Sequence, residues 1–332
     1  MSTEASPVLL GLLGVLAFSV TFPATTLAEE SFSPVLVGVG RSVLGAVLAV
    51  AVLAARRERL LPPRERLVSF LIVVATVGVG FGLLSALALR HVSSVHGAVL
   101  TGLIPAATAG LAVLRAGERP RPGYWLALLL GLAVVVGFAV AEGGGRLRGP
   151  DILLLVAIVV GGTGYAEGGI LAREYGGWRV ICWALILTLP ASLPITVVAA
   201  VADPARHVTA GAALGLAYVS IFSMCLGYFA WYQGMARGGV ARIGRLQLAQ
   251  PALTLAWSAL LLGEHVSWLT GVAATAVIAA TAVGRNARVD TRQPAGPARP
   301  GIPPPIPPQL AAPRVRGELP AAARRTPLDH AW

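Results

Sequence analysis

One acidic side chain, Glu167, lies well inside an apolar segment of this 332-residue sequence. It belongs to the stretch GGTGYAEGGI at residues 161–170, in which five residues are glycine. A carboxyl group that is removed from water, with no cation nearby, holds a proton near neutral pH. Proton-coupled transport requires this property, so Glu167 is the candidate proton-coupling residue. The alternative is a protonated Glu167 that hydrogen-bonds a neighbouring helix. Gly164 and Gly168 form a small-xxx-small pair, which predicts close helix packing.

Arg41 is a second charge inside an apolar segment, in the stretch VGVGRSVL. It lies about eight residues from the outer boundary, too deep for its guanidinium to reach the membrane surface easily. Charges inside a membrane usually face the protein interior and find partners there. Arg41 either bonds helix-end carbonyls as a structural residue or pairs with a substrate or an acid. Depth counting puts Glu167 on the cytoplasmic side of the centre and Arg41 on the outer side, so no direct salt bridge is required.

Aromatic and amide side chains supply further candidates for substrate contact. Apolar pockets with a few polar groups are typical of small-solute sites, although aromatic residues near helix ends also form interfacial belts. The complete predicted substrate-binding set is Glu167, Tyr165, Arg41, Tyr228, Trp231, Gln247 and Gln250.

No pattern in the sequence favours catalysis or metal binding. Neither His91 nor His96 has an acid or a cysteine beside it at a metal-ligand spacing, and Cys182 and Cys225 fall inside apolar segments. The glycines at 161–164 lack the strand–loop–helix context of a phosphate-binding loop. Activated-serine, paired-carboxylate and HExxH motifs are absent from the sequence. We therefore expect no enzyme activity, no cofactor and no metal.

The elements that position these residues are predicted to be membrane-spanning helices. Only 12% of the residues are charged and the mean hydropathy is +0.75, whereas a soluble domain carries about 25% charged residues. The charges separate apolar segments of about 20 residues, the length that crosses a bilayer as a helix. We expect an all-α integral membrane protein with ten transmembrane helices. These helices are predicted at residues 7–27, 33–54, 67–89, 95–115, 123–141, 151–172, 178–201, 210–234, 243–263 and 266–284.

The arginines predict the orientation of these helices. Loops after the second, fourth, sixth and eighth helices carry thirteen arginines, and the remaining loops carry four. Because cytoplasmic loops carry the excess of positive charge, these four loops and both termini are predicted to be cytoplasmic, in the cell membrane. The same distribution argues against nucleic-acid binding, despite a net charge of +11. The first segment lacks a positive n-region and a clear cleavage site, so we expect a retained helix rather than a signal peptide.

The last 47 residues, 286–332, differ sharply in composition from the rest of the chain. They hold eleven prolines, including PPPIPP at 303–308, and seven arginines. Such a composition predicts a disordered cytoplasmic tail. The tail is expected to touch anionic lipid, with a proline-rich partner site as the alternative.

Two stretches of the sequence repeat at a constant offset of 146 residues. They are PAATAGLAVLRAGE at 105–118 and PALTLAWSALLLGE at 251–264, and six of their fourteen positions are identical. Each copy covers the fourth predicted helix of a five-helix half and the turn into the fifth. Because five is odd, the second half must cross the membrane in the opposite sense, which makes an inverted-topology repeat.

The repeat predicts two five-helix halves, at residues 1–143 and 150–285. Each copy of the repeated stretch ends in an acid, Glu118 in the first half and Glu264 in the second. A carboxylate at this position favours the positive end of a helix. We expect these two acids to be structural rather than substrate ligands.

Ten helices in two halves, each with a Pro…Gly-Glu signature at the turn from fourth to fifth helix, resemble the drug/metabolite transporter superfamily, EamA type. The resemblance covers residues 8–285 and leaves out the tail. It implies a central cavity that opens alternately to each side, with a substrate among amino acids, drugs and other small solutes. Around the first helix, FSVTFPATTL replaces the tryptophan-rich pattern of many relatives.

The leading hypothesis is a secondary transporter of small metabolites or drugs that works by alternating access, with proton coupling and with efflux favoured over uptake. The expected partners are a small-molecule substrate and the lipid bilayer, with no nucleic acid, and a homodimer stays open. Two other classes also stay open. One is an integral-membrane enzyme, and the other is a non-transporting receptor or scaffold that acts through its tail.

Overall fold

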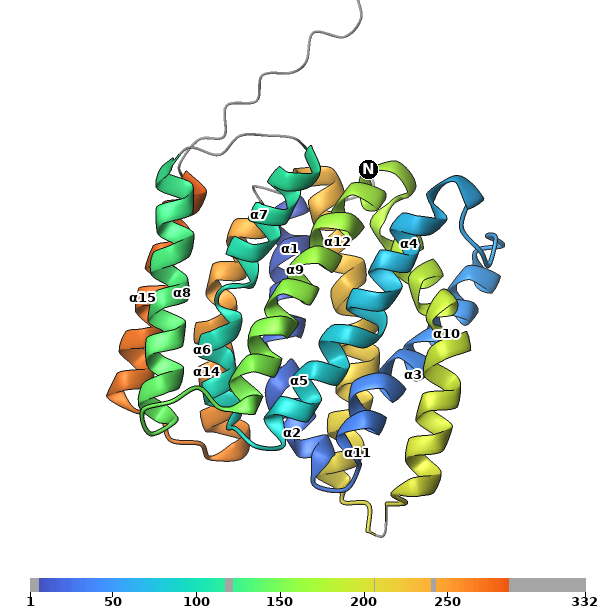
Figure 1. Ribbon diagram of the computed structural model, residues 1–332. Coiled ribbons are helices and arrows are strands. Elements are labelled where there is room, and N and C mark those ends of the chain that lie inside the picture. Colours follow the sequence, from blue (N-terminus) through green and yellow to red (C-terminus); the bar gives the residue numbers. More distant parts are fainter. Residues whose placement is uncertain (1–5, 117–121, 206, 240–242, 287–332) are drawn as a thin grey trace, which may run out of the picture. The chain divides into compact units, whose positions relative to one another are not determined.

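The computed structural model describes residues 6–116, 122–205, 207–239 and 243–286 of the chain. Within these ranges the regular structure is helical, without a strand. The described residues belong to one compact unit (Figure 1). Glu118 and the tail beyond residue 286 lie outside the described residues.

The first half of the chain forms a series of helices, two of which are short 3-10 or π segments. In chain order they are α1 (Pro7–Ser19), α2 (Thr21–Glu29), α3 (Pro34–Ala55), the 3-10 helix η1 (Arg64–Arg66), α4 (Leu67–Val73), the π-helix η2 (Val74–Gly80), α5 (Phe81–Leu89), α6 (Ser94–Thr101), α7 (Ile104–Ala116) and α8 (Pro122–Glu142).

The second half has a similar series of helices. In chain order they are α9 (Gly149–Tyr175), α10 (Gly177–Ala202), α11 (Ala210–Tyr218), the π-helix η3 (Val219–Gly227), α12 (Tyr228–Gly238), the 3-10 helix η4 (Arg245–Ala249), α14 (Gln250–Leu262) and α15 (Trp268–Asn286).

Seven helical stretches in the described residues are long and apolar enough to cross a membrane, by length and composition. Three shorter apolar helices, at 129–142, 246–262 and 268–280, lie where the fifth, ninth and tenth helices are expected. Large apolar side chains remain exposed on the outside of the unit, such as Leu126 at 60% and Val198 at 67%. Surfaces of this kind are suited to lipid rather than to water. The expected all-α multi-pass membrane protein is confirmed.

Hydroxyl side chains fix where several helices begin. Ser6, Ser33, Ser93 and Thr209 precede α1, α3, α6 and α11, and each accepts a hydrogen bond from the backbone N–H three residues later. A proline follows the cap directly in α1 and α3, where its missing N–H costs nothing. These caps satisfy donors that lipid cannot satisfy.

Three of the predicted helices are divided into two segments. The first is divided between α1 and α2, the fourth between α6 and α7, and the ninth between η4 and α14. Each break lies within the three residues before a proline, at Pro23, Pro105 and Pro251. Proline cannot donate to the carbonyl four residues earlier, and its ring collides with that carbonyl. The breaks therefore follow from the sequence.

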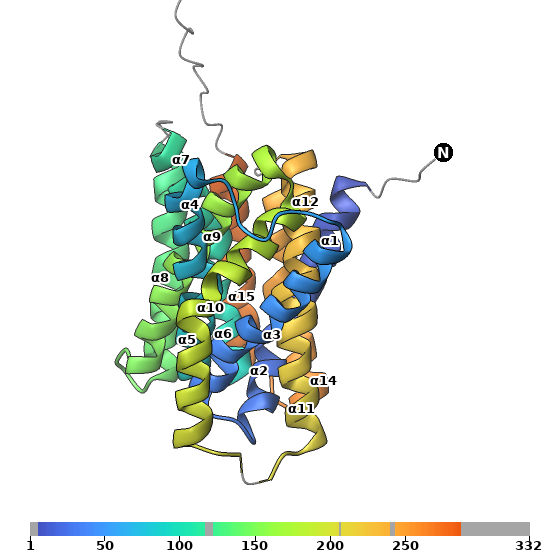
Figure 2. The same cartoon turned by 90° about the vertical axis from the view of Figure 1, so that its right-hand side faces the viewer.

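The two halves contact each other through corresponding helices. The pairs α3–α10, α8–α15 and α6–α14 each join equivalent members of the two halves, while α1–α12 and α5–α9 are reciprocal pairs. Figures 1 and 2 show α3 beside α10 at one side of the unit and α8 beside α15 at the other. This reciprocal pattern brings the broken helices α1–α2, α6–α7 and η4–α14 together in the middle, where α14 contacts α1, α2 and α6.

Candidate functional site

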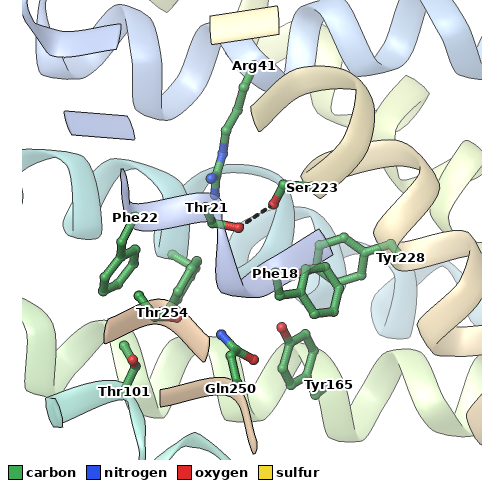
Figure 3. Close-up of a pocket in the computed structure, with 11 residues that line it drawn as sticks. Phe18, Thr21, Phe22, Arg41, Thr101, Tyr165, Ser223, Tyr228, Gln250 and Thr254 are labelled. Carbon is green, nitrogen blue, oxygen red and sulfur yellow. Dashed lines mark hydrogen bonds between the residues drawn. The ribbon is translucent and has the colours of Figure 1, made fainter. Parts of the chain in front are cut away.

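A small cavity lies between the two halves, close to the helix breaks (Figure 3). Its volume is about 20 Å³, enough for roughly one water molecule. Eight helices and one π segment contribute to its wall. The lining residues are Phe18, Thr21, Phe22, Arg41, Phe81, Thr101, Tyr165, Ser223, Tyr228, Gln250 and Thr254.

Arg41 provides the only charge among the described residues that line this cavity. Its side chain leaves α3 and is only 4% exposed. Space for the guanidinium comes from Gly82 of α5, because a Cβ atom there would lie 2.5 Å from Arg41 Nη2 and 2.7 Å from Nε. Gly38 and Gly82 also allow α3 and α5 to touch through their backbones, since a Cβ on Gly38 would lie 2.8 Å from Leu83 Cα. The glycines therefore place a buried cation against a helix backbone.

Arg41 forms no ion pair with an acidic side chain among the described residues. Its Nε is buried and forms no hydrogen bond to any described group. A guanidinium does not lose its proton in proteins, so burial cannot neutralise it. A buried charge without a partner is costly. The sequence left two interpretations of Arg41 open. The structural one requires backbone carbonyls to accept hydrogen bonds from the guanidinium, and at Nε no such bond is present.

Gln250, the first residue of α14, faces Arg41 from the opposite side of the cavity (Figure 3). Its amide oxygen Oε1 is buried and accepts no hydrogen bond from the described residues. Two residues that line the cavity, Arg41 and Gln250, therefore each have a buried polar atom without a partner among the described residues, a donor on one and an acceptor on the other. Buried polar groups are nearly always paired, so both atoms indicate a missing partner.

Aromatic rings form one wall of the cavity. Phe18 of α1 lies 4.8 Å from Tyr228 of α12 and 5.9 Å from Tyr165 of α9, measured between ring centroids. Tyr165 and Tyr228 are 5.8 Å apart. Trp231 is in contact with this group, 5.8 Å from Tyr165, but it lies behind the wall and does not line the cavity. The cluster joins three helices from both halves with a rigid apolar surface.

Hydroxyl groups complete the lining, and sequence analysis missed them. Thr21 Oγ1 and Ser223 Oγ lie 2.8 Å apart and join α2 to η3 across the two halves. Thr254 and Thr101 belong to α14 and α6, near the breaks. The sequence contained a signal for two of them. Thr254 is part of the repeated stretch, and Thr21 lies where FSVTFPATTL departs from the tryptophan-rich pattern. Ser223 carries no such signal.

Glu167 is buried, at 3% exposed, but it does not line the cavity. It follows Tyr165 by two residues on α9, which turns it about 200° around the helix. Glu167 is engaged by a neighbouring group and is not an isolated charge. Its role in proton coupling stays a prediction, separate from the site that contains Arg41.

The remaining predicted residues, Trp231 and Gln247, are also buried outside the cavity lining. Gln247 lies in η4 at 2% exposed, and its Nε2 has no hydrogen-bond partner among the described residues. Among the predicted substrate contacts, the structure therefore gathers Arg41, Tyr165, Tyr228 and Gln250 around one space.

Gly164 and Gly168 serve two different neighbours. A Cβ atom on Gly164 would lie 2.5 Å from Val77 Cγ2 in η2. Gly168 instead lies against the ring of Tyr232 in α12, whose hydroxyl donates to the Gly164 carbonyl at 3.0 Å. The predicted close packing is present, with one glycine for each adjoining element.

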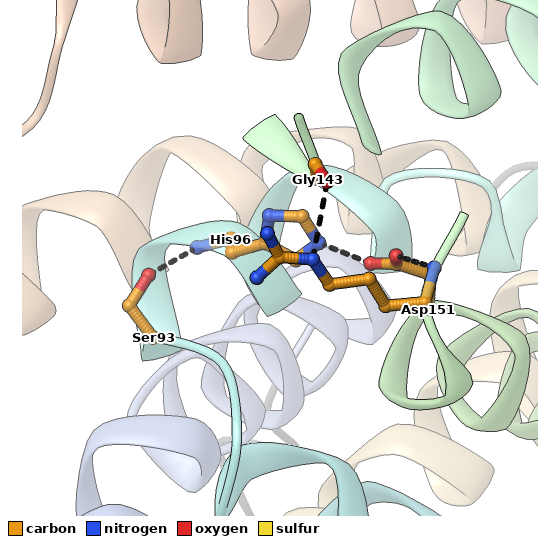
Figure 4. Close-up of polar contacts among 5 residues, drawn as sticks. Ser93, His96, Gly143 and Asp151 are labelled. Atoms are coloured by element: carbon orange, nitrogen blue, oxygen red, sulfur yellow. Dashed lines mark hydrogen bonds and ion pairs between the residues drawn. The ribbon is translucent and has the colours of Figure 1, made fainter. Parts of the chain in front are cut away.

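His96 and Asp151 form a buried pair at the end of the unit that holds the 143–149 loop (Figure 4). Nε2 of His96 on α6 lies 2.7 Å from Oδ1 of Asp151 on α9. The other carboxylate oxygen accepts a hydrogen bond from the backbone N–H of Arg148 at 2.8 Å and caps α9. The sequence offers no acid beside His96, because its partner comes from the other half. Among the described residues no three ligating side chains gather as a metal site.

Glu264 has the structural role expected of it, but on an unexpected helix. Its Oε1 and Oε2 accept hydrogen bonds from the backbone N–H groups of Ser94 and Val95, at 3.0 and 2.8 Å. Glu264 therefore caps α6 of the first half rather than α15, which follows it in the chain. The cap favours the positive end of α6 and ties the two halves together.

At the opposite end of the unit, charged residues join the loop after α3 to the second half. Arg179 Nε donates to Glu58 Oε1 at 3.1 Å, and this hydrogen bond holds the pKa of the Glu58 carboxyl below its usual range. Arg66 and Glu174 form an exposed ion pair of 3.0 Å. Exposed pairs of this kind contribute little to stability, so these contacts order the loop without forming a site.

Known proteins resemble this chain along most of its length. The model of the EamA-like transporter family matches residues 5–140 and again residues 149–283. The uncharacterized transporter YdeK of Bacillus subtilis (strain 168) is 45% identical over 276 residues, which cover 83% of this chain and 96% of that protein. A solved structure described as "Crystal structure of protein" has a TM-score of 0.59 and 18% identity, covering 83% of this chain and 95% of its own. That last likeness concerns the fold alone.

Proposed function

The chain belongs to the EamA-like transporter family, and from that premise we propose that it is a secondary transporter that moves a small metabolite or drug by alternating access. In the proposed arrangement ten helices cross the cell membrane, residues 1–143 and 150–285 form two inverted five-helix halves, and both termini are cytoplasmic. The tail 286–332 lies in the cytoplasm, and export is the favoured direction.

The cavity around Arg41 and Gln250 is the observation that carries this proposal. It lies between corresponding helices of the two halves, and its lining residues Arg41 and Gln250 each have a buried polar atom without a partner in the described part of the chain. Transporters built from repeats place their substrate at this interface, beside interrupted helices. With a volume of about 20 Å³, the cavity must enlarge to admit a metabolite, as alternating access requires.

The course of the chain supports inverted halves. α1 and α9, the first helices of the two halves, run in opposite directions through the unit (Figure 1). The start of α1 and the end of α15 lie at the same end, as an even number of crossings requires. The π segments η2 and η3 occupy equivalent positions, within one residue of the 146-residue offset.

A transport assay with paired threonine variants tests the site. Thr254 lines the cavity, whereas Thr108, its counterpart at the 146-residue offset, bonds the Ile104 carbonyl outside it. The transported compound is first identified by comparing metabolites released by cells with and without the protein. Thr254→Leu should then lower its initial transport rate about tenfold or more in proteoliposomes, because overfilling a close-packed site costs about 1–3 kcal/mol.

Thr108→Leu is the matched control and should retain most of the rate, since both threonines are buried and neither variant adds charge. Equal losses in the two variants, with both proteins folded, would remove the cavity as the transport site. The absence of any compound that the protein moves would contradict the proposal as a whole.

Proton coupling through Glu167 is proposed as a separate step. Glu167→Gln keeps the size of the side chain and removes the titratable group. Accumulation of the compound driven by a pH gradient should then be lost, while exchange of the compound at equal pH on both sides continues. Gradient-driven accumulation at the wild-type level would show that Glu167 does not couple protons.

The two other classes make different predictions. A receptor or scaffold that acts through its tail would lose function when residues 286–332 are deleted, whereas transport should survive the deletion. A membrane enzyme needs converging nucleophile, acid–base or metal groups. The lining of the described cavity instead offers one guanidinium, amide and hydroxyl groups, and aromatic rings.

A further inference from the structure

We infer that the solute recognised in this cavity is a small organic monocarboxylate, with its carboxylate on the Arg41 guanidinium and its apolar body against the Phe18, Tyr165 and Tyr228 rings. The inference rests on the proposed transport function and goes beyond it by naming the substrate class.

The charge of Arg41 is the first observation that defines the ligand. Arg41 is 96% buried, remains ionised, and meets no acidic side chain in the described lining. An uncompensated cation at this position is costly, and an anion from outside the chain offsets that cost. A guanidinium presents its donors in a planar fork that fits a carboxylate with two parallel hydrogen bonds. The described lining holds one cation, which a single negative charge on the ligand would neutralise.

The opposite wall adds a hydrogen-bonding requirement. Gln250 lines the same space, and its Oε1 is a buried acceptor without a partner among the described residues, so an anion with no hydrogen to donate leaves this oxygen unpaired. A ligand that satisfies both walls carries a carboxylate at one end and a hydroxyl or amino donor near it.

The aromatic wall defines the rest of the ligand. Phe18, Tyr165 and Tyr228 lie within 6 Å of one another by ring centroids. Phe22 and Phe81, which stack at 6.4 Å, add a second apolar surface to the lining. A solute without an apolar part would leave these rings uncovered, so the fitting ligand is amphiphilic.

Three related compounds test each part of the ligand. 3-Phenyllactate carries the carboxylate, the hydroxyl and a ring; 3-phenyllactamide replaces the carboxylate by a neutral amide; 3-phenylpropionate lacks the hydroxyl. Binding to the full-length protein in lipid nanodiscs is measured by isothermal titration calorimetry. 3-Phenyllactate should bind about 10- to 100-fold more tightly than its amide, the range for a hydrogen bond to a charged group. 3-Phenylpropionate should bind about 5-fold or more weakly than 3-phenyllactate.

Equal binding of 3-phenyllactate and its amide would overturn the inference. So would acetate or inorganic phosphate that binds as tightly as 3-phenyllactate, because either result would remove the need for the apolar wall. These comparisons use the wild-type protein and therefore do not depend on any variant that fails to fold.

Two substitutions place the carboxylate on Arg41. Arg41→Gln should reduce 3-phenyllactate binding to the level of the amide and leave binding of the amide unchanged. Gln250→Glu supplies an internal carboxylate opposite Arg41 and should abolish the preference for the acid, whereas Gln250→Met should keep it. If Arg41→Gln does not fold, the contrast between Gln250→Glu and Gln250→Met decides. A preserved preference in Gln250→Glu would contradict the assignment.

Transport assays and binding measurements separate the carboxylate site from the transport function. If the protein transports only neutral or cationic compounds, transport stands and the carboxylate site falls. If 3-phenyllactate binds through Arg41 but no compound crosses proteoliposomes, the site stands and transport falls.

Discussion

At the scale of single residues, glycines decide whether a charge can be buried. Arg41 lies in the interior because Gly82 has no side chain where the guanidinium passes, and because Gly38 lets the two helices touch. Helical periodicity predicts which face of a helix is inside. It does not predict that a glycine on another helix will leave room for a guanidinium.

Gly82→Ala is expected to destabilise the protein by about 1–3 kcal/mol, because the new methyl group meets both Arg41 and the Gly38 carbonyl, and backbone cannot move aside cheaply. The thermal unfolding midpoint in detergent should fall. Gly137→Ala is the control: nothing lies within 4 Å of the added Cβ in α8. It should be neutral or raise stability by up to about 1 kcal/mol, since alanine favours a helix. Equal midpoints for the two variants would refute the close contact.

The sequence alone predicted part of the candidate site, including Arg41 and Gln250. Arg41 was found because a charge in an apolar segment is conspicuous, and Gln250 because polar groups in apolar surroundings are typical of small-solute sites. Glu167 is equally conspicuous, yet its position on α9 turns it away from the cavity that Tyr165 lines. Depth along a helix can be counted from sequence, but the neighbours around it depend on how other helices pack.

At the scale of elements, the breaks before Pro105 and Pro251 link sequence to mechanism. They fall at equivalent places in the two halves, and Thr101, Gln250 and Thr254 of the cavity lining lie at or near them. Interrupted segments at corresponding positions are the best pointer in a sequence to a transporter's binding site. The prolines of the repeat therefore indicate the position of the candidate site better than the acids at the ends of the repeated stretches.

Pro251→Ala is expected to slow transport several-fold without destabilising the fold. Alanine restores an N–H that can bond the Gln247 carbonyl, so η4 and α14 can join as one helix. Initial rates in proteoliposomes should fall, and the unfolding midpoint should stay the same or rise. Pro194→Ala is the control, because Pro194 lies inside the continuous helix α10. Unchanged transport by Pro251→Ala would mean that the break has no part in the cycle.

At the scale of the whole molecule, the repeat predicted the architecture and left its connections open. The apolar segments and the 146-residue offset indicated helices in two halves. They could not show that Glu264 caps α6 or that His96 meets Asp151, since each contact joins segments far apart in the chain. Both contacts join the two halves.

The His96–Asp151 pair should stabilise the state in which the two halves are in contact, if the cavity opens toward the 143–149 loop. His96→Phe removes the 2.7 Å contact and keeps the ring packing on Phe138, whose centroid lies 5.2 Å from that of His96. Asp151 retains its cap on α9 through Oδ2. The open state should therefore become more populated, because only the closed state contains the bond that is lost.

Cysteine labelling measures this shift. Thr101→Cys places a thiol in the cavity lining, in a chain whose buried Cys182 and Cys225 are replaced by alanine. A membrane-impermeant thiol reagent added on the side of the 143–149 loop should react several-fold faster when His96→Phe is also present. Glu142→Gln, in the same surface hollow but without a bond to His96, is the matched control and should leave the rate unchanged. Equal rates with and without His96→Phe would mean that the halves do not separate at this pair, and the opening would then have to begin elsewhere along the interface.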